Sequence, residues 1–147
     1  MKKIFILTNA LLSFFIATVA QSSEIFTKNN KALDGYDVVA FYKEKQPVKG
    51  VEHITYNWKN VTWIFSNQQN LDTFKSNPEK YAPQFGGYCA YGCSNGYKAP
   101  TQVDTWIILD DKLYFNYNQK VKESWFKNKD VLIEKATKNW AKIKDNP

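Results

Sequence analysis

Apolar, strand-forming runs occur in the chain as two pairs, and two turn-forming residues separate the runs of each pair. The runs are 53–58 and 61–65, which flank Lys59-Asn60, and 105–109 and 112–116, which flank Asp110-Asp111. Asn60 is able to adopt the left-handed backbone conformation that tight hairpin turns require. The pattern therefore predicts two β-hairpins. The short apolar run 38–42 predicts one more strand, after a turn over 34–37.

Helical periodicity begins after the first hairpin. Apolar residues at helical spacing predict a helix over 68–76, which Ser66 or Asn67 caps and Asn77-Pro78 ends. The tail is again helical, with a break near 128–130, and its last part is amphipathic. The apolar face of that part consists of Leu132, Ile133, Ala136, Trp140 and Ile143. Together these elements predict an α+β domain, in which a small antiparallel sheet of hairpins packs with short helices and a C-terminal amphipathic helix.

The first twenty residues have the features of a secretory signal peptide. Lys2 and Lys3 form a basic start, residues 4–19 are mostly apolar, and Ala20 is the small residue that a signal peptidase prefers. The apolar run is short for a stable membrane span, and no cysteine lies near Ala20 to carry a lipid. We therefore expect residues 1–20 to be a cleaved leader, 21–31 a flexible arm and 32–147 a single domain. The mature protein is expected to be periplasmic or secreted, with no stable membrane anchor.

The charge pattern argues against nucleic-acid binding. The net charge of the sequence is +6, and all 20 basic residues are lysines. Nucleic-acid recognition relies on arginine, whose guanidinium group binds bases and phosphates through paired hydrogen bonds. No lysine cluster is dense enough to follow a phosphate backbone. The basic excess is therefore interpreted as a solvated surface.

Residues 85–97 concentrate the unusual residue types of the chain. The stretch contains both cysteines, four of the six glycines and three of the nine tyrosines. If residues 88–94 are helical, Cys89 and Cys93 lie one turn apart on the same face, with Cβ atoms about 6 Å apart. A relaxed disulfide needs roughly 3.8 Å between the Cβ atoms. A helix break at Gly92 would instead permit a disulfide, and two buried, inert thiols are a third interpretation.

Two nearby thiols in an exported protein also suit a metal ion. Thiolates are good ligands for Cu(I) and zinc, and Cu(I) is bound by as few as about two or three ligands. His53 is the only histidine and a candidate third ligand, although its position also fits an ordinary residue at a strand end. The first hypothesis is therefore a metal-binding or metal-handling module with Cys89, Cys93 and His53 as ligands. Copper is preferred over zinc, and a periplasmic metal-handling protein is a candidate partner.

Two further hypotheses use the same stretch differently. In a thiol-redox protein, Cys89 would be the reactive thiol and Cys93 the resolving thiol. In a non-catalytic binding module, aromatic side chains would line a small-ligand pocket or a partner surface, unless they simply pack in the core. These aromatic residues are Tyr88, Tyr91, Tyr97 and Trp106. Hydrolysis finds little support, because no motif connects His53 with Cys89 as the base that a cysteine nucleophile needs. An enzymatic role is thus less favoured than a binding role.

Several motifs in combination resemble those of exported YHS-domain proteins. They are LDGYDVVAFY at 33–42, TWIFS at 62–66, NPEKYAP at 77–83, GGYCAYG at 86–92, LYFNYN at 113–118 and Asn139-Trp140. The resemblance covers about residues 32–140 and implies a small α+β module of a kind thought to handle metals. YHS domains commonly carry cysteines in the first strand-turn and at the strand-to-helix junction, whereas this chain has none at 34–37 or 65–68. Of the residues proposed as ligands, the resemblance therefore supports only Cys89.

Overall fold

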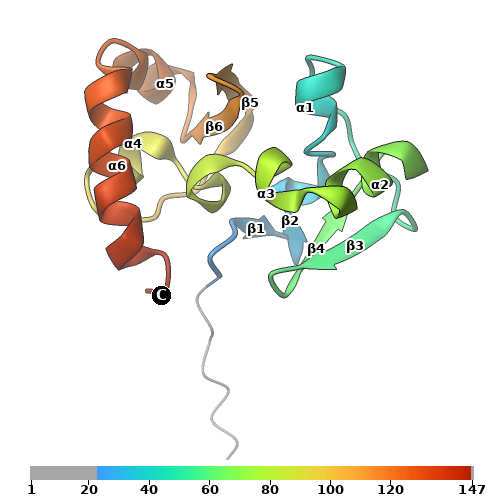
Figure 1. Ribbon diagram of the computed structural model, residues 1–147. Helices are drawn as coiled ribbons and strands as arrows, with labels where there is room; N and C mark the ends of the chain where they lie inside the picture. Colours follow the sequence, from blue (N-terminus) through green and yellow to red (C-terminus); the bar gives the residue numbers. More distant parts are fainter. Residues whose placement is uncertain (1–22, 147) are drawn as a thin grey trace, which may run out of the picture.

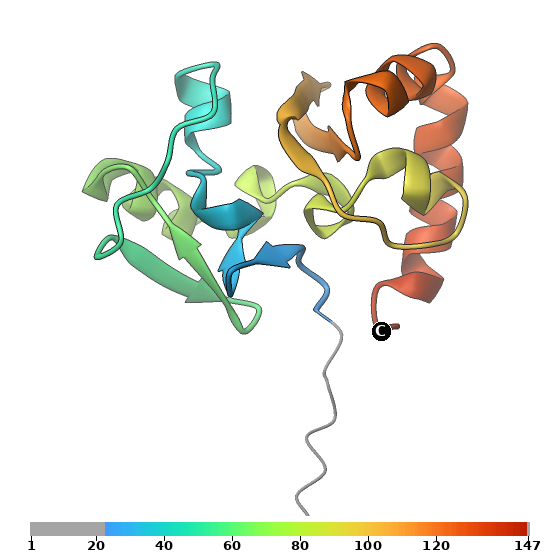
Figure 2. The same ribbon diagram turned by 180° about the vertical axis from the view of Figure 1, so that it is seen from behind.

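The computed structural model describes residues 23–146, so the predicted leader lies outside the described part of the chain. Within that part the protein has an α+β fold (Figures 1 and 2). The strands are β1 (Thr27–Lys28), β2 (Lys31–Ala32), β3 (Thr55–Trp58), β4 (Val61–Ile64), β5 (Gln102–Leu109) and β6 (Lys112–Asn116). The α-helices are α1 (Ala40–Lys43), α2 (Gln68–Ser76), α3 (Pro78–Tyr81), α4 (Ala90–Ser94), α5 (Gln119–Phe126) and α6 (Lys129–Ile143). Two short 3-10 segments are η1 (Leu33–Gly35) and η2 (Gln84–Gly87).

The strands form two separate sheets. The first has the order β1-β2-β4-β3 and is mixed, because β2 and β4 pair in parallel while the other neighbours are antiparallel. The second is the β5–β6 hairpin. Both hairpins predicted from the sequence are confirmed, and Lys59 and Asn60 have the positive φ values, 52° and 59°, of a tight hairpin turn. The structure differs from the predicted small antiparallel sheet in the parallel pairing of β2 with β4 and in the separation of the strands into two sheets.

Residues 38–39 form a turn and residues 40–42 belong to helix α1, so the strand predicted at 38–42 is wrong. The carboxylate of Asp37 explains the difference. Its Oδ1 atom accepts hydrogen bonds from the backbone N–H groups of Val39 (2.9 Å) and Ala40 (3.3 Å), which stabilises a helical turn at this point. Phe41 and its apolar neighbours are completely buried, so the run lacks the alternation that distinguishes a half-buried strand from a buried helix.

Asparagine side chains begin the predicted helices. Asn67 Oδ1 accepts the N–H of Asn70 at 2.8 Å, and α2 has the predicted bounds 68–76. Asn118 caps α5 in the same way, and Asn128 lies at the predicted break before α6. The helical tail is therefore confirmed. In the described part of the chain, no helix combines the length and the apolar character that crossing a membrane requires.

The segment 23–31 is integrated into the fold, where the sequence predicts a flexible arm. The side chain of Ile25 is only 2% exposed and packs in the core. The N–H of Phe26 donates to the carbonyl oxygen of Gly86 at 2.8 Å, and β1 then pairs with β2. The remainder of the predicted arm, residues 21–22, lies outside the described residues.

Two hydrophobic cores lie on opposite faces of the β5–β6 hairpin. The first lies among the mixed sheet, α1 and α2, and the second among α4, α5 and α6. Along β6, Leu113 and Phe115 pack in the first core and Tyr114 packs in the second, because successive side chains of a strand point to opposite faces. The ring centroid of Phe115 is 5.4 Å from that of Phe41, and the ring of Tyr114 is 5.6 Å from that of Trp125. Both views show the hairpin between the two groups of elements.

Candidate functional site

Cys89 is the N-cap residue of α4, and its sulfur is held by hydrogen bonds within the fold. The Sγ atom accepts the backbone N–H of Gly92 (3.4 Å) and that of Tyr117 (3.2 Å). The thiol also lies 3.7 Å from Asn116 Oδ1, to which it donates. The side chain is 2% exposed. Cys89 therefore joins the start of α4 to the end of β6, and its sulfur is not presented to solvent.

Cys93 lies in the second core and is completely buried. Burial raises the pKa of its thiol to about 12, with a smaller contribution from Cys89 that the charge of Lys98 opposes. Neither cysteine forms a disulfide. Because the thiolate is the nucleophile, Cys93 in this buried position is poorly suited to nucleophilic chemistry at neutral pH.

His53 is exposed in the loop before β3, and the structure does not group it with the cysteines. The strand β3 packs against β4 and α2, whereas α4 packs against α6, α5 and β6. Among residues 23–146, no group of three or more His, Cys, Asp or Glu side chains is placed to hold a metal ion. The three-ligand set of Cys89, Cys93 and His53 is thus not assembled in this conformation.

The four aromatic residues predicted to line a pocket are separated in the structure. They are Tyr88, Tyr91, Tyr97 and Trp106. Trp106 packs on the first core, with its ring 5.5 Å from that of Phe41, whereas Tyr88 and Tyr91 pack on the second. Tyr97 is 53% exposed. Two hollows on the described surface, of about 500 and 360 Å³, are lined by other residues.

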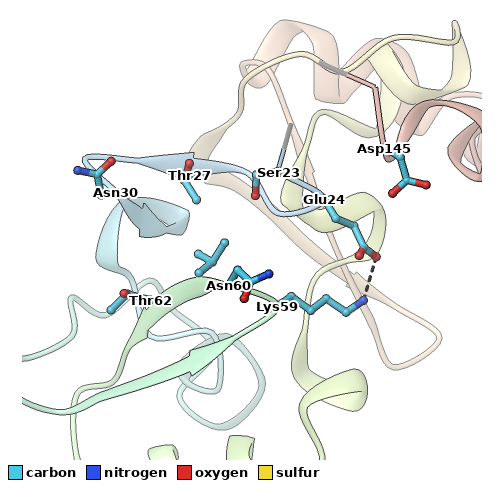
Figure 3. Close-up of a pocket in the computed structure, with 9 residues that line it drawn as sticks. Ser23, Glu24, Thr27, Asn30, Lys59, Asn60, Thr62 and Asp145 are labelled. Atoms are coloured by element: carbon cyan, nitrogen blue, oxygen red, sulfur yellow. Dashed lines mark hydrogen bonds and ion pairs between the residues drawn. The ribbon is translucent and has the colours of Figure 1, made fainter. Parts of the chain in front are cut away.

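The larger hollow is a polar cleft where the N-terminal segment, the first hairpin and the end of the chain meet (Figure 3). Glu24 precedes β1, Lys59 and Asn60 form the β3–β4 turn, Thr62 lies on β4, and Asp145 follows α6. Nearly all side chains that line the cleft are polar or charged. Its volume of about 500 Å³ is within the range of small-molecule sites.

Of the two carboxylates that line this cleft, one forms an ion pair with a described lysine. Glu24 Oε1 and Lys59 Nζ are 2.9 Å apart, and each side chain is about a third exposed. Lys59 Nζ also lies 3.9 Å from the carboxylate of Glu79 and 4.8 Å from the ring centre of Trp58. Asp145 forms no ion pair with another described residue. Among residues 23–146, the cleft therefore contains one carboxylate in an ion pair and one, that of Asp145, outside any ion pair.

The glycine- and tyrosine-rich stretch holds the N-terminal wall of the cleft. Gly86 has φ +60°, and a Cβ atom at this position would lie 1.8 Å from the carbonyl oxygen of Glu24. Its own carbonyl oxygen accepts the N–H of Phe26 at 2.8 Å. The hydroxyl of Tyr88 donates to the carbonyl oxygen of Ser23 at 3.0 Å. The backbone of Glu24 lies so close to residue 86 that only glycine fits there. Tyr88 does not line the cleft, but its hydrogen bond holds the segment around Ser23 in place.

Lys98 binds the C-terminal segment that contributes Asp145 to the cleft. Its Nζ atom donates to the backbone carbonyl oxygens of Lys144 (3.3 Å) and Asn146, which flank Asp145. The same Nζ lies 5.3 Å from the ring centre of Tyr88. Burial lowers the pKa of Lys98, and the nearby carboxylate of Asp145 opposes that shift. Tyr88 and Lys98 thus connect the two segments that carry the carboxylates of the cleft.

Sequence reasoning missed this cleft because its charged residues come from three distant segments. Glu24, Lys59 and Asp145 belong to no common motif or periodicity. The only part of the cleft that the sequence pattern predicts is the Lys59-Asn60 turn. This turn indicates a hairpin, but it does not indicate which segments of the chain pack next to the hairpin.

Comparison with protein-family models, with curated proteins and with solved structures finds no match. The resemblance to exported YHS-domain proteins therefore stays a prediction from the sequence motifs.

Proposed function

We propose that this protein is an exported, non-catalytic binding module that holds a small polar molecule in the cleft. The observation that carries the proposal is the cleft of about 500 Å³, a volume typical of small-molecule sites. Its hydroxyl and amide groups are available to a ligand. Within the described residues, no hydrogen bond is formed by the side chains of Thr27, Asn30, Asn60 and Thr62.

The surroundings of the cysteines favour this function over thiol-redox chemistry or metal handling. A redox-active thiol must reach its partner as a thiolate. Burial raises the pKa of Cys93 to about 12, and hydrogen bonds within the fold engage the buried sulfur of Cys89. Copper or zinc binding by Cys89 and Cys93, with His53 as a third ligand, would require these separated groups to rearrange. Binding of both metals is therefore tested directly.

The test is a set of amide NMR spectra of the ¹⁵N-labelled protein, recorded with small ammonium, carboxylate and polyol compounds. Cu(I) and Zn²⁺ are added separately under anaerobic conditions. We expect one class of organic compound to shift the amide signals of Asn60 and Thr62 in a saturable manner. A Thr62→Val substitution removes a cleft hydroxyl and keeps the side-chain shape, so it should weaken binding about threefold or more, as expected for one lost hydrogen bond.

The matched control is Thr55→Val, which makes the same chemical change on the neighbouring edge strand, outside the cleft. It should leave the affinity unchanged. Equal effects of the two substitutions would show that the cleft hydroxyl is not a binding group. Metal-induced shifts around Cys89, with no response of the cleft to any organic compound, would overturn the proposal and favour metal handling.

A further inference from the structure

The cleft is locally acidic in a basic protein. The net charge of the sequence is +6, yet Lys59 in the cleft lies 2.9 Å from the carboxylate of Glu24 and 3.9 Å from that of Glu79. Asp145 adds a carboxylate that forms no ion pair with a described residue, although the charged group of Lys98 lies near it. These three carboxylates still outnumber the two ammonium groups of Lys59 and Lys98. Because opposite charges attract most strongly at short range, this end of the cleft favours a cation.

The donor set fits an organic cation better than a metal ion. Calcium takes about six to eight oxygen ligands, and magnesium demands near-octahedral geometry. Two carboxylates line the cleft, and the described residues contain no group of three or more acidic, histidine or cysteine side chains placed for a metal. A primary ammonium group donates about three hydrogen bonds. Glu24, Asp145 and a hydroxyl of Ser23 or Thr27 are acceptors of the right kind.

We propose that the cleft binds a small organic molecule that carries a primary ammonium group. The ammonium group lies at the end of the cleft where Figure 3 shows the carboxylates of Glu24 and Asp145. The other polar groups of the ligand bind the side chains of Asn60 and Thr62. This assignment rests on the proposed function, because it names the ligand class of the same cleft.

Three probes of similar size test the assignment. Ethanolamine, ethylene glycol and glycolate present an ammonium, a hydroxyl and a carboxylate group, respectively, beside the same hydroxymethyl group. In titrations followed by NMR, ethanolamine should shift the amide signals of Glu24, Lys59 and Asp145 in a saturable manner, and the other two probes should not. Added salt should weaken the binding, since the charges are partly exposed.

Two substitutions that remove charge with little change in shape complete the test. Glu24→Gln and Asp145→Asn should each weaken ethanolamine binding about threefold to tenfold, the range for one partly exposed, charge-assisted contact. Glu123→Gln removes an exposed carboxylate of α5 outside the cleft and should have no effect.

The outcomes separate the ligand class from the function. Binding of glycolate or ethylene glycol that depends on Thr62 would overturn the ammonium assignment and leave the proposed function intact. A cleft that responds to none of these probes, nor to the wider panel of compounds, would overturn both.

Discussion

The buried carboxylate of Asp37 connects three elements, and its removal should strongly destabilise the fold. Asp37 is completely buried. Oδ1 accepts the N–H groups of Val39 and Ala40, at 2.9 and 3.3 Å, at the start of α1. Oδ2 accepts the N–H and hydroxyl of Ser66, at 2.8 and 2.7 Å, and the Nδ2 of Asn70 at 2.7 Å. The residue thus joins α1 and the start of α2 to the end of β4.

Substitution of Asp37 by Asn keeps the size of the side chain but replaces one acceptor oxygen by an NH₂ donor. The hydroxyl of Ser66 is able to rotate and accept from this group, whereas the N–H of Ser66 and the Nδ2 of Asn70 then face another donor. Each hydrogen bond to a charged group contributes about 1.5–3 kcal/mol, so two lost bonds predict a loss of about 3 kcal/mol or more in the free energy of unfolding. The total free energy of unfolding of a typical domain is about 5–15 kcal/mol.

The assay is urea-induced unfolding followed by tryptophan fluorescence, with Asp34→Asn as the matched control. Asp34 has φ 54°, which asparagine tolerates, and its carboxylate lies 3.5 Å from Lys49 Nζ at the surface. The control should cost about 0.5 kcal/mol or less, as is usual for a surface ion pair. A loss below about 1 kcal/mol for Asp37→Asn, or one equal to that of the control, would refute the reasoning, because two lost charge-assisted bonds require more.

Three more outcomes are expected. Asn67→Ala removes the cap on the N–H of Asn70 and should lower the free energy of unfolding by about 1 kcal/mol in urea titrations; an unchanged midpoint would show that the cap is dispensable. Gly86→Ala places a Cβ atom 1.8 Å from the carbonyl oxygen of Glu24 at a positive φ, so the melting temperature should fall sharply, whereas a tolerated alanine would mean that the N-terminal segment moves aside freely. The folded thiol of Cys93 stays protonated up to about pH 12, while the unfolded thiol ionises near pH 9. Stability should therefore be intact below pH 9 and decline as the pH rises toward 12, because the unfolded state releases its proton first. Urea titrations between pH 8 and 10 should show a shallower decline for Cys93→Ala, and identical slopes would contradict the assignment.

Local pattern predicted most of the secondary structure. The two hairpins, α2 and the broken helical tail each follow from residues close together in the sequence, such as the Lys59-Asn60 turn. The strand predicted at 38–42 is wrong because four of its five side chains are completely buried, so the segment shows no alternation of buried and exposed positions. The hydrogen bonds that Ser66 and Asn70 donate to Asp37 join positions about thirty residues apart. The sequence alone indicates only a turn at this aspartate.

The candidate site was harder to predict, for a physical reason. Cysteines are rare and chemically reactive, so the sequence favours Cys89 and Cys93 as functional residues. In the structure, Cys89 caps a helix and Cys93 packs in a hydrophobic core. Glu24, Lys59 and Asp145 are common surface residue types, and only the tertiary structure brings them to one cleft. The stretch around the cysteines does contribute to the cleft, through backbone positions that no motif reveals.

The alternation along β6 has a consequence for how the molecule comes apart. Leu113 and Phe115 serve one core and Tyr114 the other, so the hairpin is a wall common to both halves. Unfolding of either half would uncover one face of the hairpin and expose its large apolar side chains to water. The free-energy cost increases with the apolar area exposed. We therefore expect a single melting transition for the two halves. On this reasoning the two cores unfold as one cooperative unit, and a destabilising substitution in one core should lower the stability of the other.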